Sequence, residues 1–345
     1  MKKIIITGGG TGGHVVPCLA IAENLKNDYE IHYIGSINGI EKEMVKNIPY
    51  IKYHEITTCK LIRSFTPKNL AIPFKLLKGY NQSKKLIKQI QPNIIFSKGG
   101  YVSVPVVYAG AKFKIPIISH ESDLTLGLAN KINLKKSKYM CCSFSKTAQD
   151  LKNKGVYTGS PIRKQIFLGK KENIENIYKL QNKQSILILG GSLGSKNLNT
   201  LIRNNLKTLC EKYNVFHICG KGNKVQSSYE NYFQMEFVNN IQDYYKLVDV
   251  VISRAGSNVI FELLALNKKM ILIPLEKNSR GDQVENAKYF EQKGYAKMLF
   301  ENVTDNVFIK SITDMLDNNK IAINQEKEKT DAVNDIISLL KSNSL

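Results

Sequence analysis

The sequence has no uninterrupted hydrophobic run of the length that a transmembrane helix needs, although 43% of its 345 residues are hydrophobic. MKK leads directly into IIIT without a signal-peptide cleavage pattern, so we expect a soluble chain without a secretory leader. The six cysteines show neither CxxC nor His/Cys spacing and are expected to be reduced cytosolic thiols. No DxD sequence and no compact group of His, Asp and Glu occurs, so we expect no metal and no cofactor.

Acidic residues are missing from Ile56 to His120, whereas this stretch contains eleven Lys and Arg residues. The formal net charge of the whole chain is +21. Such an asymmetry favours a negatively charged partner, either nucleic acid or an anionic membrane surface. A lysine-rich proteome would account for the overall charge, but it accounts less well for the acid-free stretch.

The segment 65–88 interleaves apolar and basic residues. Its members are Phe65, Leu70, Ile72, Phe74, Leu76, Leu77 and Tyr80, with Lys68, Lys75, Lys78, Lys84, Lys85 and Lys88 between them. Leu70, Phe74 and Leu77 recur at helical spacing, which favours an amphipathic helix on an anionic membrane surface. The alternative is that the same apolar residues pack in a core. No nucleic acid is expected, because aromatic platforms and a recognisable nucleic-acid-binding motif are missing.

Apolar runs alternate with helix-like segments through most of the chain. The runs that indicate buried parallel strands are KKIIIT, EIHYIG, NIIFS, IPIIS, KYMCCS, SILILG, NVFHIC, VDVVIS and KMILIP. This alternation predicts an α/β fold. The length, and the echo of IIITGGGTGGH in ILILGGSLGSKNLN, predict two Rossmann-like domains. We place them at 1–158 and 159–325, with a C-terminal helix at about 326–345 packing on the first.

Residues 8–13, GGGTGG, stand between the first predicted strand and a helical pattern. Glycine lets backbone N–H groups approach a ligand closely, and a helix that begins behind such a turn favours phosphate. The alternative is a tight turn without a ligand. A dinucleotide site is disfavoured, since the second strand ends in Gly35 and Ser36 where an acidic residue is needed. No GxxxxGK[ST] occurs, which disfavours a P-loop.

His14 follows the last glycine and is expected in the first turn of the helix. The helix N-terminus disfavours the imidazolium ion, so the ring should stay neutral and basic. Because ligands bind beyond the carboxyl ends of parallel strands, both glycine turns should face one cleft between the domains. His14 is therefore a candidate general base. A helix-capping or purely structural histidine is the alternative.

Three polar clusters follow apolar strands in the second half: GGSLGS (190–195), SRAGSNVIFE (253–262) and RGDQVENA (280–287). Taken singly, each resembles ordinary surface chemistry, but together they favour a nucleotide site. Ser192 offers phosphate donors, and Glu262 can accept hydrogen bonds from a ribose. If a diphosphate leaves, helix N-termini, backbone N–H groups and basic residues such as Arg163 must meet its charge.

Seven segments, in order along the chain, resemble the MurG family: GGGTGGHVVP, FSKGGYVSVP (96–105), HESDLTLGLANK (120–131), TGSPIR (158–163), GGSLGSKNLN, SRAGSNVIFE and RGDQVENA. The resemblance implies a GT-B fold and an inverting glycosyltransferase of peptidoglycan synthesis, active in cell-wall biogenesis and cell division. The family transfers N-acetylglucosamine from UDP-GlcNAc to the C4 hydroxyl of MurNAc in undecaprenyl-diphosphate-MurNAc-pentapeptide (lipid I), giving lipid II.

The resemblance also implies roles for individual residues. His14 is the family's usual candidate for the base. The residues expected to bind substrate are Thr11, Gly12, Gly13, Asp123, Arg163, Ser192, Val238, Ser257, Glu262, Gln283 and Asn286. Those expected on the acceptor side are Gly9, Gly10, Gly99, Gly100, Tyr101 and Glu121. This sequence departs from the family at Asp123, where many members have Asn in HEQN, and in the LTLG that follows.

The resemblance further implies a peripheral protein on the cytoplasmic face of the cell membrane, with UDP-GlcNAc, an undecaprenyl-diphosphate acceptor and cell-wall or division proteins as partners. Phe65–Lys88 would supply the contact with the anionic membrane. Two other readings stay open at this point. One is a different GT-B enzyme of UDP-sugars, such as a glycolipid glycosyltransferase or a UDP-GlcNAc 2-epimerase. The other is a non-catalytic paralogue that binds UDP-GlcNAc.

Overall fold

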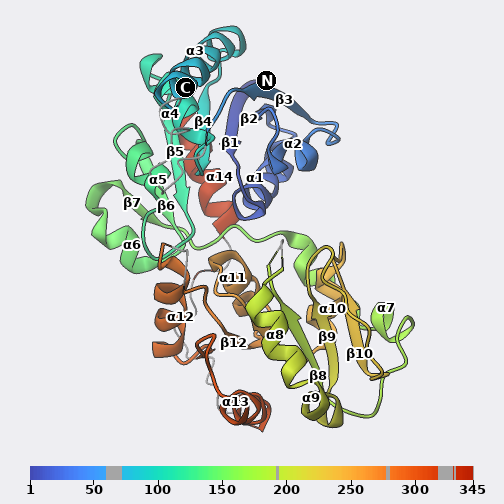
Figure 1. Cartoon of the computed structure of the whole chain (residues 1–345). Helices are drawn as coiled ribbons and strands as arrows, with labels where there is room; N and C mark the ends of the chain where they lie inside the picture. The colour runs from blue at the N-terminus through green and yellow to red at the C-terminus, as the bar shows by residue number, and fades with distance from the viewer. Residues whose placement is uncertain (60–71, 192–193, 277–279, 318–328, 330–331, 345) are drawn as a thin grey trace. The chain divides into compact units, whose positions relative to one another are not determined.

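The computed structural model describes residues 1–59, 72–191, 194–276, 280–317, 329 and 332–344. The chain divides into two compact units, Met1–Arg163 with Asp331–Leu345, and Lys164–Thr330. Gly159 and Pro161 precede the division between Arg163 and Lys164. Each unit contains its own parallel sheet (Figure 1).

The sheet of the first unit has the order β3-β2-β1-β4-β5-β6-β7. Its strands are β1 (Lys2–Gly8), β2 (Tyr29–Ser36), β3 (Ile51–Ile56), β4 (Ile94–Gly99), β5 (Ile117–Glu121), β6 (Tyr139–Cys142) and β7 (Gly155–Tyr157). The helices are α1 (Gly12–Leu25), α2 (Ile40–Val45), α3 (Ile72–Ile90), α4 (Ser103–Lys112), α5 (Leu128–Asn133), α6 (Ser145–Asp150) and α14 (Ala332–Asn343).

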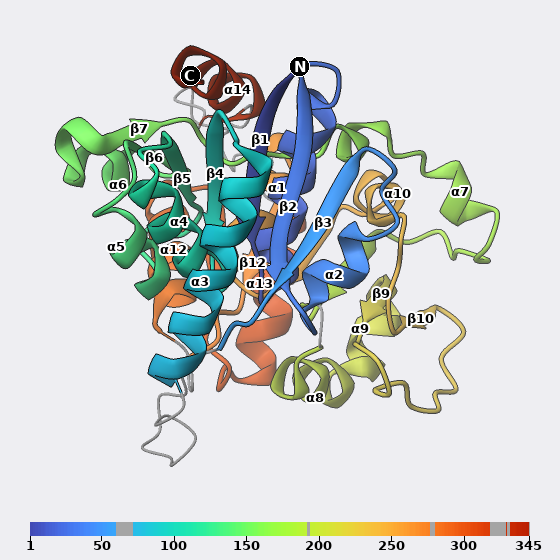
Figure 2. The same cartoon turned by 90° about the horizontal axis from the view of Figure 1, so that it is seen from above.

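Strand β1 is buried on both faces of its sheet, and its side chains alternate between two apolar cores. Ile4 and Ile6 point into the core that α1 and α14 share. Ile5 points into the opposite core, together with residues of α3 and α4. Figure 2 shows α3 and α4 side by side against the sheet. The continuous apolar run IIIT is therefore the signature of a strand covered by helices on both sides.

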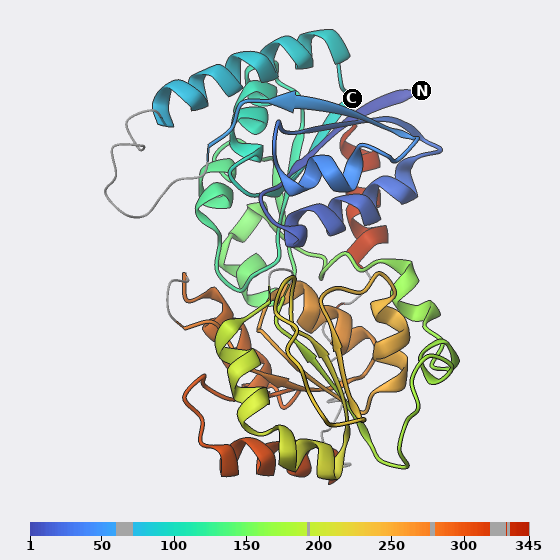
Figure 3. The same cartoon turned by 45° about the vertical axis from the view of Figure 1, so that its right-hand side comes forward.

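Helix α14 returns the end of the chain to the first unit. Ala332, Val333, Ile336 and Leu340 recur at helical spacing and are buried in the same core as α1. Figures 1 and 3 show α14 beside α1. At its carboxyl end, the Lys341 ammonium lies 2.7 Å from a carboxylate oxygen of Asp28.

The sheet of the second unit has the order β10-β9-β8-β11-β12-β13. Its strands are β8 (Ser185–Leu189), β9 (Asn214–Ile218), β10 (Tyr232–Met235), β11 (Val250–Ser253), β12 (Lys269–Leu272) and β13 (Lys297–Met298). The helices are α7 (Glu172–Glu175), α8 (Lys196–Asn204), α9 (Leu206–Lys212), α10 (Ile241–Leu247), α11 (Ser257–Ala265), α12 (Asp282–Gln292) and α13 (Asp305–Asp317).

The second unit has an apolar core of its own. Ile186 and Ile188 of β8 pack with residues of α8, α9 and α13. Aromatic rings gather elsewhere in this unit, where Phe216 of β9 meets Tyr244 of α10 edge-on and Phe261 of α11 meets Phe290 of α12. All nine strands predicted from apolar runs are confirmed, as are the parallel sheets.

Four strands were not predicted, namely β3, β7, β10 and β13. Each of them forms one edge of its sheet. An edge strand is paired on one side only and does not need a continuous apolar run. IKYHEI of β3, for example, has only its two terminal isoleucines buried.

Candidate functional site

The predicted site residues of the first unit gather where its strand order reverses, between β1 and β4. Open parallel sheets bind ligands beyond the carboxyl ends of their strands at such a switch point. Here Gly8 of β1 pairs with Gly99 of β4, after a register shift next to Thr7. The turn after β4 packs on the turn after β1, since a Cβ on Gly100 would meet the Gly9 carbonyl oxygen. The two glycine turns therefore form one surface.

The first glycine turn covers a buried carboxylate that the sequence did not reveal. Glu41 has no exposed surface, and its Oε2 accepts a hydrogen bond from the Gly10 N–H at 3.1 Å. Its Oε1 accepts from the N–H and the hydroxyl of Ser36, at 2.9 and 2.5 Å. A Cβ on Gly9 would lie 2.6 Å from the Glu41 carboxyl carbon. Gly9 is thus explained by a close approach to this side chain.

The remaining residues of the turn face outward. Gly10 has a φ of +88°, a left-handed conformation that favours glycine, and the Tyr101 ring packs against it. A Cβ on Gly12, by contrast, would meet no atom within 4 Å. The open side of the turn therefore begins at Thr11 and Gly12, which are the residues assigned to substrate.

His14 lies in the first turn of α1, as predicted. Its N–H donates to the carbonyl oxygen of Thr11, the N-cap residue, at 3.1 Å. The Thr11 hydroxyl lies 2.9 Å from His14 Nδ1. If Nδ1 carries the proton and donates to the hydroxyl, Nε2 is the basic nitrogen of the ring. The Thr11 hydroxyl thus orients the ring of His14.

Glu121 organises the loop that follows β5. Oε1 accepts hydrogen bonds from the N–H groups of Ser122 and Asp123, at 2.9 and 3.1 Å. Oε2 accepts from the Gly127 N–H at 2.8 Å and from the Asn130 amide at 3.0 Å. Glu121 as a whole is 6% exposed, and burial raises the pKa of its carboxyl group. These four bonds give Glu121 a structural task inside the loop, while Asp123 lies half-buried at its surface.

The second unit repeats the arrangement at its own switch point, between β8 and β11. Gly191 and Gly194 of its turn have φ values of +86° and +75°. Ser195 caps α8, and its hydroxyl oxygen accepts from the Leu198 N–H at 3.4 Å. Ser192 lies outside the described residues. The described part of this turn leads into a helix N-terminus, the environment that favours phosphate.

Arg254, which the sequence analysis did not single out, holds this edge of the second sheet together. Its guanidinium donates to the Ser195 hydroxyl, to the Glu301 carboxylate and to the carbonyl oxygens of Ile273 and Pro274. These partners follow β8, β13 and β12, and Arg254 itself follows β11. The Arg254 and Glu301 side chains are 10% and 11% exposed. The pair therefore joins four strand ends.

The other residues assigned to UDP-GlcNAc lie after β10, β11 and β12. Val238 is half-buried between β10 and α10, and Ser257 begins α11. Glu262 is half-buried on α11. Near the N-terminus of α12, Gln283 accepts a hydrogen bond from the Leu275 N–H at 3.0 Å. Asn286 is fully buried and donates to the Ala255 carbonyl oxygen at 3.3 Å, so it ties α12 to the turn before α11.

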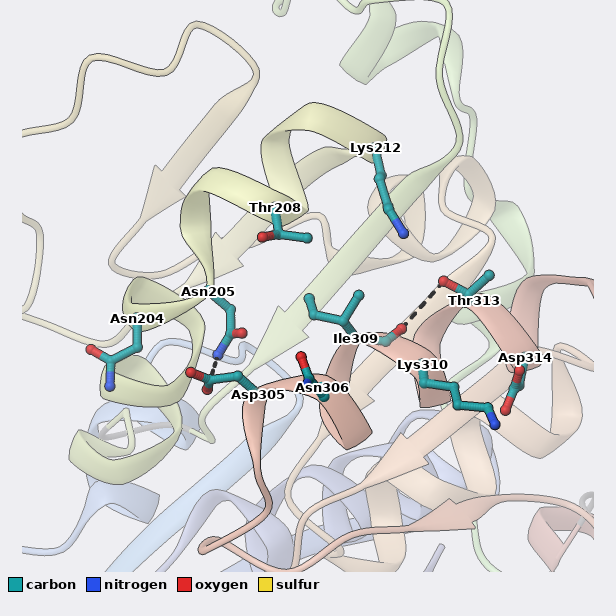
Figure 4. A pocket seen from close by; sticks show the side chains of 10 residues that line it. All are labelled: Asn204, Asn205, Thr208, Lys212, Asp305, Asn306, Ile309, Lys310, Thr313 and Asp314. Atoms are coloured by element: carbon teal, nitrogen blue, oxygen red, sulfur yellow. Dashed lines mark hydrogen bonds between the residues drawn. The ribbon is translucent and has the colours of Figure 1, made fainter.

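A groove of about 460 Å³ in the second unit lies between α8–α9 and α13 (Figure 4). Asn205 donates to Asp305 across it at 2.7 Å, and the lining includes Thr208, Lys212 and Thr313. It contains none of the predicted site residues.

Within the described ranges, no group of three or more His, Cys, Asp and Glu side chains is arranged to hold a metal ion.

Helix α3 carries the described part of the predicted membrane segment. Residues 65–71, including Phe65, Lys68 and Leu70, lie outside the described residues. Phe74 and Leu77 are 76% and 58% exposed, whereas Ile87 and Ile90, near the other end of the helix, are buried. Among the helices that the structure describes, none combines the length and apolarity needed to cross a bilayer.

Residues 4–141 match the glycosyltransferase family 28 N-terminal domain, and residues 185–340 match the C-terminal domain of the same family. A protein of Clostridium tetani is 47% identical over 99% of this chain and 98% of its own length. Its name is UDP-N-acetylglucosamine–N-acetylmuramyl-(pentapeptide) pyrophosphoryl-undecaprenol N-acetylglucosamine transferase. A protein of Lachnoclostridium phytofermentans with the same name is 46% identical over 99% of each chain.

Two solved structures have the same fold. Acinetobacter baumannii MurG is 24% identical, with a TM-score of 0.73 over 99% of this chain and 100% of its own. A UDP-GlcNAc 2-epimerase of Neisseria meningitidis, bound to UDP-GlcNAc, is 13% identical, with a TM-score of 0.69 over 99% of this chain and 100% of its own. The predicted GT-B fold, with two parallel sheets, is confirmed.

Proposed function

The chain belongs to the MurG family within glycosyltransferase family 28, and we propose on that basis that it makes lipid II. It transfers N-acetylglucosamine from UDP-GlcNAc to the C4 hydroxyl of MurNAc in undecaprenyl-diphosphate-MurNAc-pentapeptide. The observation that carries this proposal is the 47% identity to the Clostridium tetani transferase along practically the whole of both chains. The residues that follow the strands at the switch point of each sheet would supply the groups that such a reaction needs.

We assign general-base catalysis to His14. Attack by the acceptor hydroxyl on the anomeric carbon requires that the hydroxyl lose its proton, and a neutral imidazole can take it. The 2.9 Å contact between the Thr11 hydroxyl and Nδ1 supports this role, because it holds the imidazole ring in one orientation. Thr11 is then a positioning residue in addition to its assigned contact with substrate.

We assign UDP-GlcNAc to the second unit. Glu262 would hold the ribose, the backbone at Val238 the uracil, and Arg163, Ser192 and Ser257 the phosphates. Gln283 would meet the sugar. Asn286, whose amide is buried on the Ala255 carbonyl oxygen, would act by fixing the N-terminus of α12 next to the turn before α11.

We assign the acceptor to the first unit. Gly9 and Gly10 of one turn, and Gly99, Gly100 and Tyr101 of the other, would present backbone groups to its diphosphate. Thr11, Gly12 and Gly13 would contact the donor sugar and its diphosphate. Glu121 would act through the loop that its carboxylate organises. The acceptor carries a lipid, so the first unit must reach the membrane surface.

We further propose that the exposed beginning of α3 makes this contact. Phe74 and Leu77 lie three residues apart on a helix and are largely exposed, with exposed Lys75, Lys78 and Lys85 nearby. Such a face can insert its apolar side chains at the headgroup boundary, while each lysine gains about 1 kcal/mol from an anionic leaflet. The protein would then be peripheral on the cytoplasmic side of the membrane.

The function is tested by incubating the purified protein with labelled UDP-GlcNAc and lipid I and measuring lipid II. Glu262→Ala should raise the KM for UDP-GlcNAc and leave that for lipid I unchanged, because a ribose contact is mostly uniform binding. Glu211→Ala, which removes an exposed carboxylate from α9, is the control. Formation of UDP-N-acetylmannosamine without lipid II would instead identify an epimerase.

Membrane docking is tested by co-sedimentation with anionic liposomes at low and high salt. Replacing Lys75, Lys78, Lys84 and Lys85 with Gln should abolish sedimentation and leave UDP-GlcNAc binding intact. High salt should likewise reduce sedimentation, because salt screens the attraction between the lysines and the anionic lipids. The matched control replaces four exposed lysines of the second unit, Lys207, Lys212, Lys221 and Lys224. Equal binding to neutral and anionic liposomes would refute the proposal that the lysines attract the protein to an anionic membrane.

A further inference from the structure

Three buried polar side chains of the second unit are joined by hydrogen bonds. His217 interrupts the apolar run of β9 and has no exposed surface. Tyr232 at the start of β10 is 6% exposed, and Asn199 of α8 is 2% exposed. A buried imidazole is unfavourable unless its ring nitrogens find partners, so the arrangement of these partners is informative.

Both ring nitrogens of His217 have a partner. Nδ1 lies 2.8 Å from the Tyr232 hydroxyl, and Nε2 lies 2.9 Å from Asn199 Oδ1. On its other side, Asn199 Nδ2 donates to the Cys219 carbonyl oxygen at 2.9 Å. Because a carbonyl oxygen only accepts, the amide has one orientation, with Oδ1 towards the ring. The ring proton is therefore on Nε2, and the Tyr232 hydroxyl donates to Nδ1.

The ring of His217 is neutral. Burial, with a smaller contribution from the charge of Arg203, lowers the pKa of His217 to about 3. A neutral imidazole has one donor and one acceptor, so the hydrogen bonds run in a single direction. They lead from the Tyr232 hydroxyl through the ring and the Asn199 amide to the Cys219 carbonyl oxygen.

The last acceptor of this chain of bonds supports the glycine turn after β8. A Cβ on Gly194 would collide with the Cys219 carbonyl oxygen, so the turn packs directly on it. Asn199 lies one helical turn beyond the N-cap Ser195, to whose carbonyl oxygen its N–H donates at 2.8 Å. The bonds therefore tie the carboxyl end of β9 to the first turn of α8, next to the glycine turn.

We propose that His217 is a positioning residue for the donor diphosphate, acting through Asn199 on the glycine turn after β8. The inference rests on the proposed function, which assigns the diphosphate of UDP-GlcNAc to this turn. Phosphate binding by backbone N–H groups at a helix N-terminus depends on where these groups lie. A neutral ring with one tautomer holds them in place, because it offers Asn199 a single hydrogen-bonding arrangement.

The test compares the affinity for UDP, measured by calorimetry, with that for uridine, measured by its competition with UDP. Uridine has no phosphate, so only UDP reports on the turn. His217→Leu should weaken UDP binding roughly tenfold and leave uridine binding unchanged, because Asn199 loses its donor. His217→Gln should bind UDP within about twofold of the wild type, since its amide can donate to Asn199 and accept from Tyr232.

Asn199→Leu places the effect on the same chain of bonds. It should weaken UDP binding as much as His217→Leu does, and the double variant should be no weaker than either single variant, because both substitutions break one connection.

Asn231→Leu is the matched control. Asn231 is 4% exposed and donates to the Cys210 and Tyr213 carbonyl oxygens, near the amino ends of β9 and β10. Its loss should lower the melting temperature, as the loss of a buried amide does at Asn199, but leave UDP affinity at the wild-type value. The difference arises because the glycine turn lies at the carboxyl end of β9.

Equal losses of UDP and uridine affinity, a wild-type UDP affinity in His217→Leu, no rescue by Gln, additive losses in the double variant or an equal loss in Asn231→Leu would each overturn the proposal. If the leucine variants do not fold, Tyr232→Phe removes only the hydroxyl that donates to Nδ1. It should weaken UDP binding about threefold, and an unchanged affinity there would also overturn the proposal. Failure of the wild-type protein to bind UDP is a different result, because it would refute the assignment of UDP-GlcNAc to this unit.

Discussion

The glycine turn after β1 packs over a buried carboxylate, whereas the turn after β8 packs beside a buried guanidinium. In the first unit, Glu41 accepts hydrogen bonds from Gly10 and Ser36, and the structure shows no cation bonded to it among the described residues. In the second unit, Arg254 donates to Ser195 and is paired with Glu301. The two turns therefore have similar sequences, but the side chain behind the first turn is acidic and the one behind the second turn is basic.

The two buried groups support their turns in different ways. The Glu41 carboxylate accepts a hydrogen bond from the Gly10 N–H and so orders the backbone of the first turn. The Arg254 guanidinium donates to the Ser195 hydroxyl and so orders the backbone of the second turn, to which we assign the leaving diphosphate. The glycines of each turn indicate that another group lies close to the backbone. They do not indicate whether that group is an acidic side chain, a basic side chain or a ligand.

The largest effect is expected at the first turn. His14→Ala should lower kcat by about 10²–10⁴-fold, because it removes the general base. The KM for UDP-GlcNAc should stay near the wild-type value, since the donor is held by the second unit. Steady-state kinetics with lipid I measures both, and His54→Ala on the edge strand β3 is the control. Wild-type turnover in His14→Ala would end the assignment.

Arg254→Met tests the interior of the second turn. It leaves the carboxylate of Glu301 buried without its cation, so the free energy of unfolding should fall by about 3–5 kcal/mol. The double variant Arg254→Met/Glu301→Met should recover a large part of this loss, because no charge is left unpaired. Urea denaturation of the three proteins measures the effect. If the single and the double variant are equally unstable, the ion pair does not hold the strand ends together.

Glu41→Gln tests the interior of the first turn. The amide nitrogen of Gln would face an N–H donor of Gly10 or Ser36, so we expect a loss of about 1–3 kcal/mol in the free energy of unfolding. Glu43→Gln is the matched control, because Glu43 lies on the same helix in an exposed ion pair with Lys46. Equal stability of the two variants would show that the buried carboxylate contributes nothing to the turn.

The smallest change in stability is expected for Gly12→Ala. A methyl group there meets no atom within 4 Å, so the free energy of unfolding should stay within about 0.5 kcal/mol of the wild-type value. The KM for a substrate should nevertheless rise if that open side receives one. Gly9→Ala is the contrasting variant, because its methyl group collides with Glu41 and should destabilise the fold. Wild-type kinetics in Gly12→Ala would support the alternative that this turn binds no ligand.

The strands that could be predicted from the sequence are those in the middle of each sheet. IIIT and ILIL are buried on both faces and therefore appear as continuous apolar runs. The edge strands β3, β7, β10 and β13 were missed, because a strand with one open side can alternate or be short. His14 and the start of α1 were also predictable, since glycine, N-cap and helix signals are local in the sequence.

The sequence by itself determined the α/β class, the two parallel sheets, the family and the glycine turns of the candidate site, because periodicity, glycine spacing and motifs are properties of neighbouring residues. Only the tertiary structure decided which side chains support those turns. Glu41 meets Gly10 across 31 residues, Lys98 meets Ser122 across 24, and Arg254 meets Glu301 across 47. Such pairs depend on which strands are neighbours in the sheet: β1 lies next to β2, β4 next to β5, and β12 between β11 and β13. That order follows from packing of the whole unit, so no local pattern contains it.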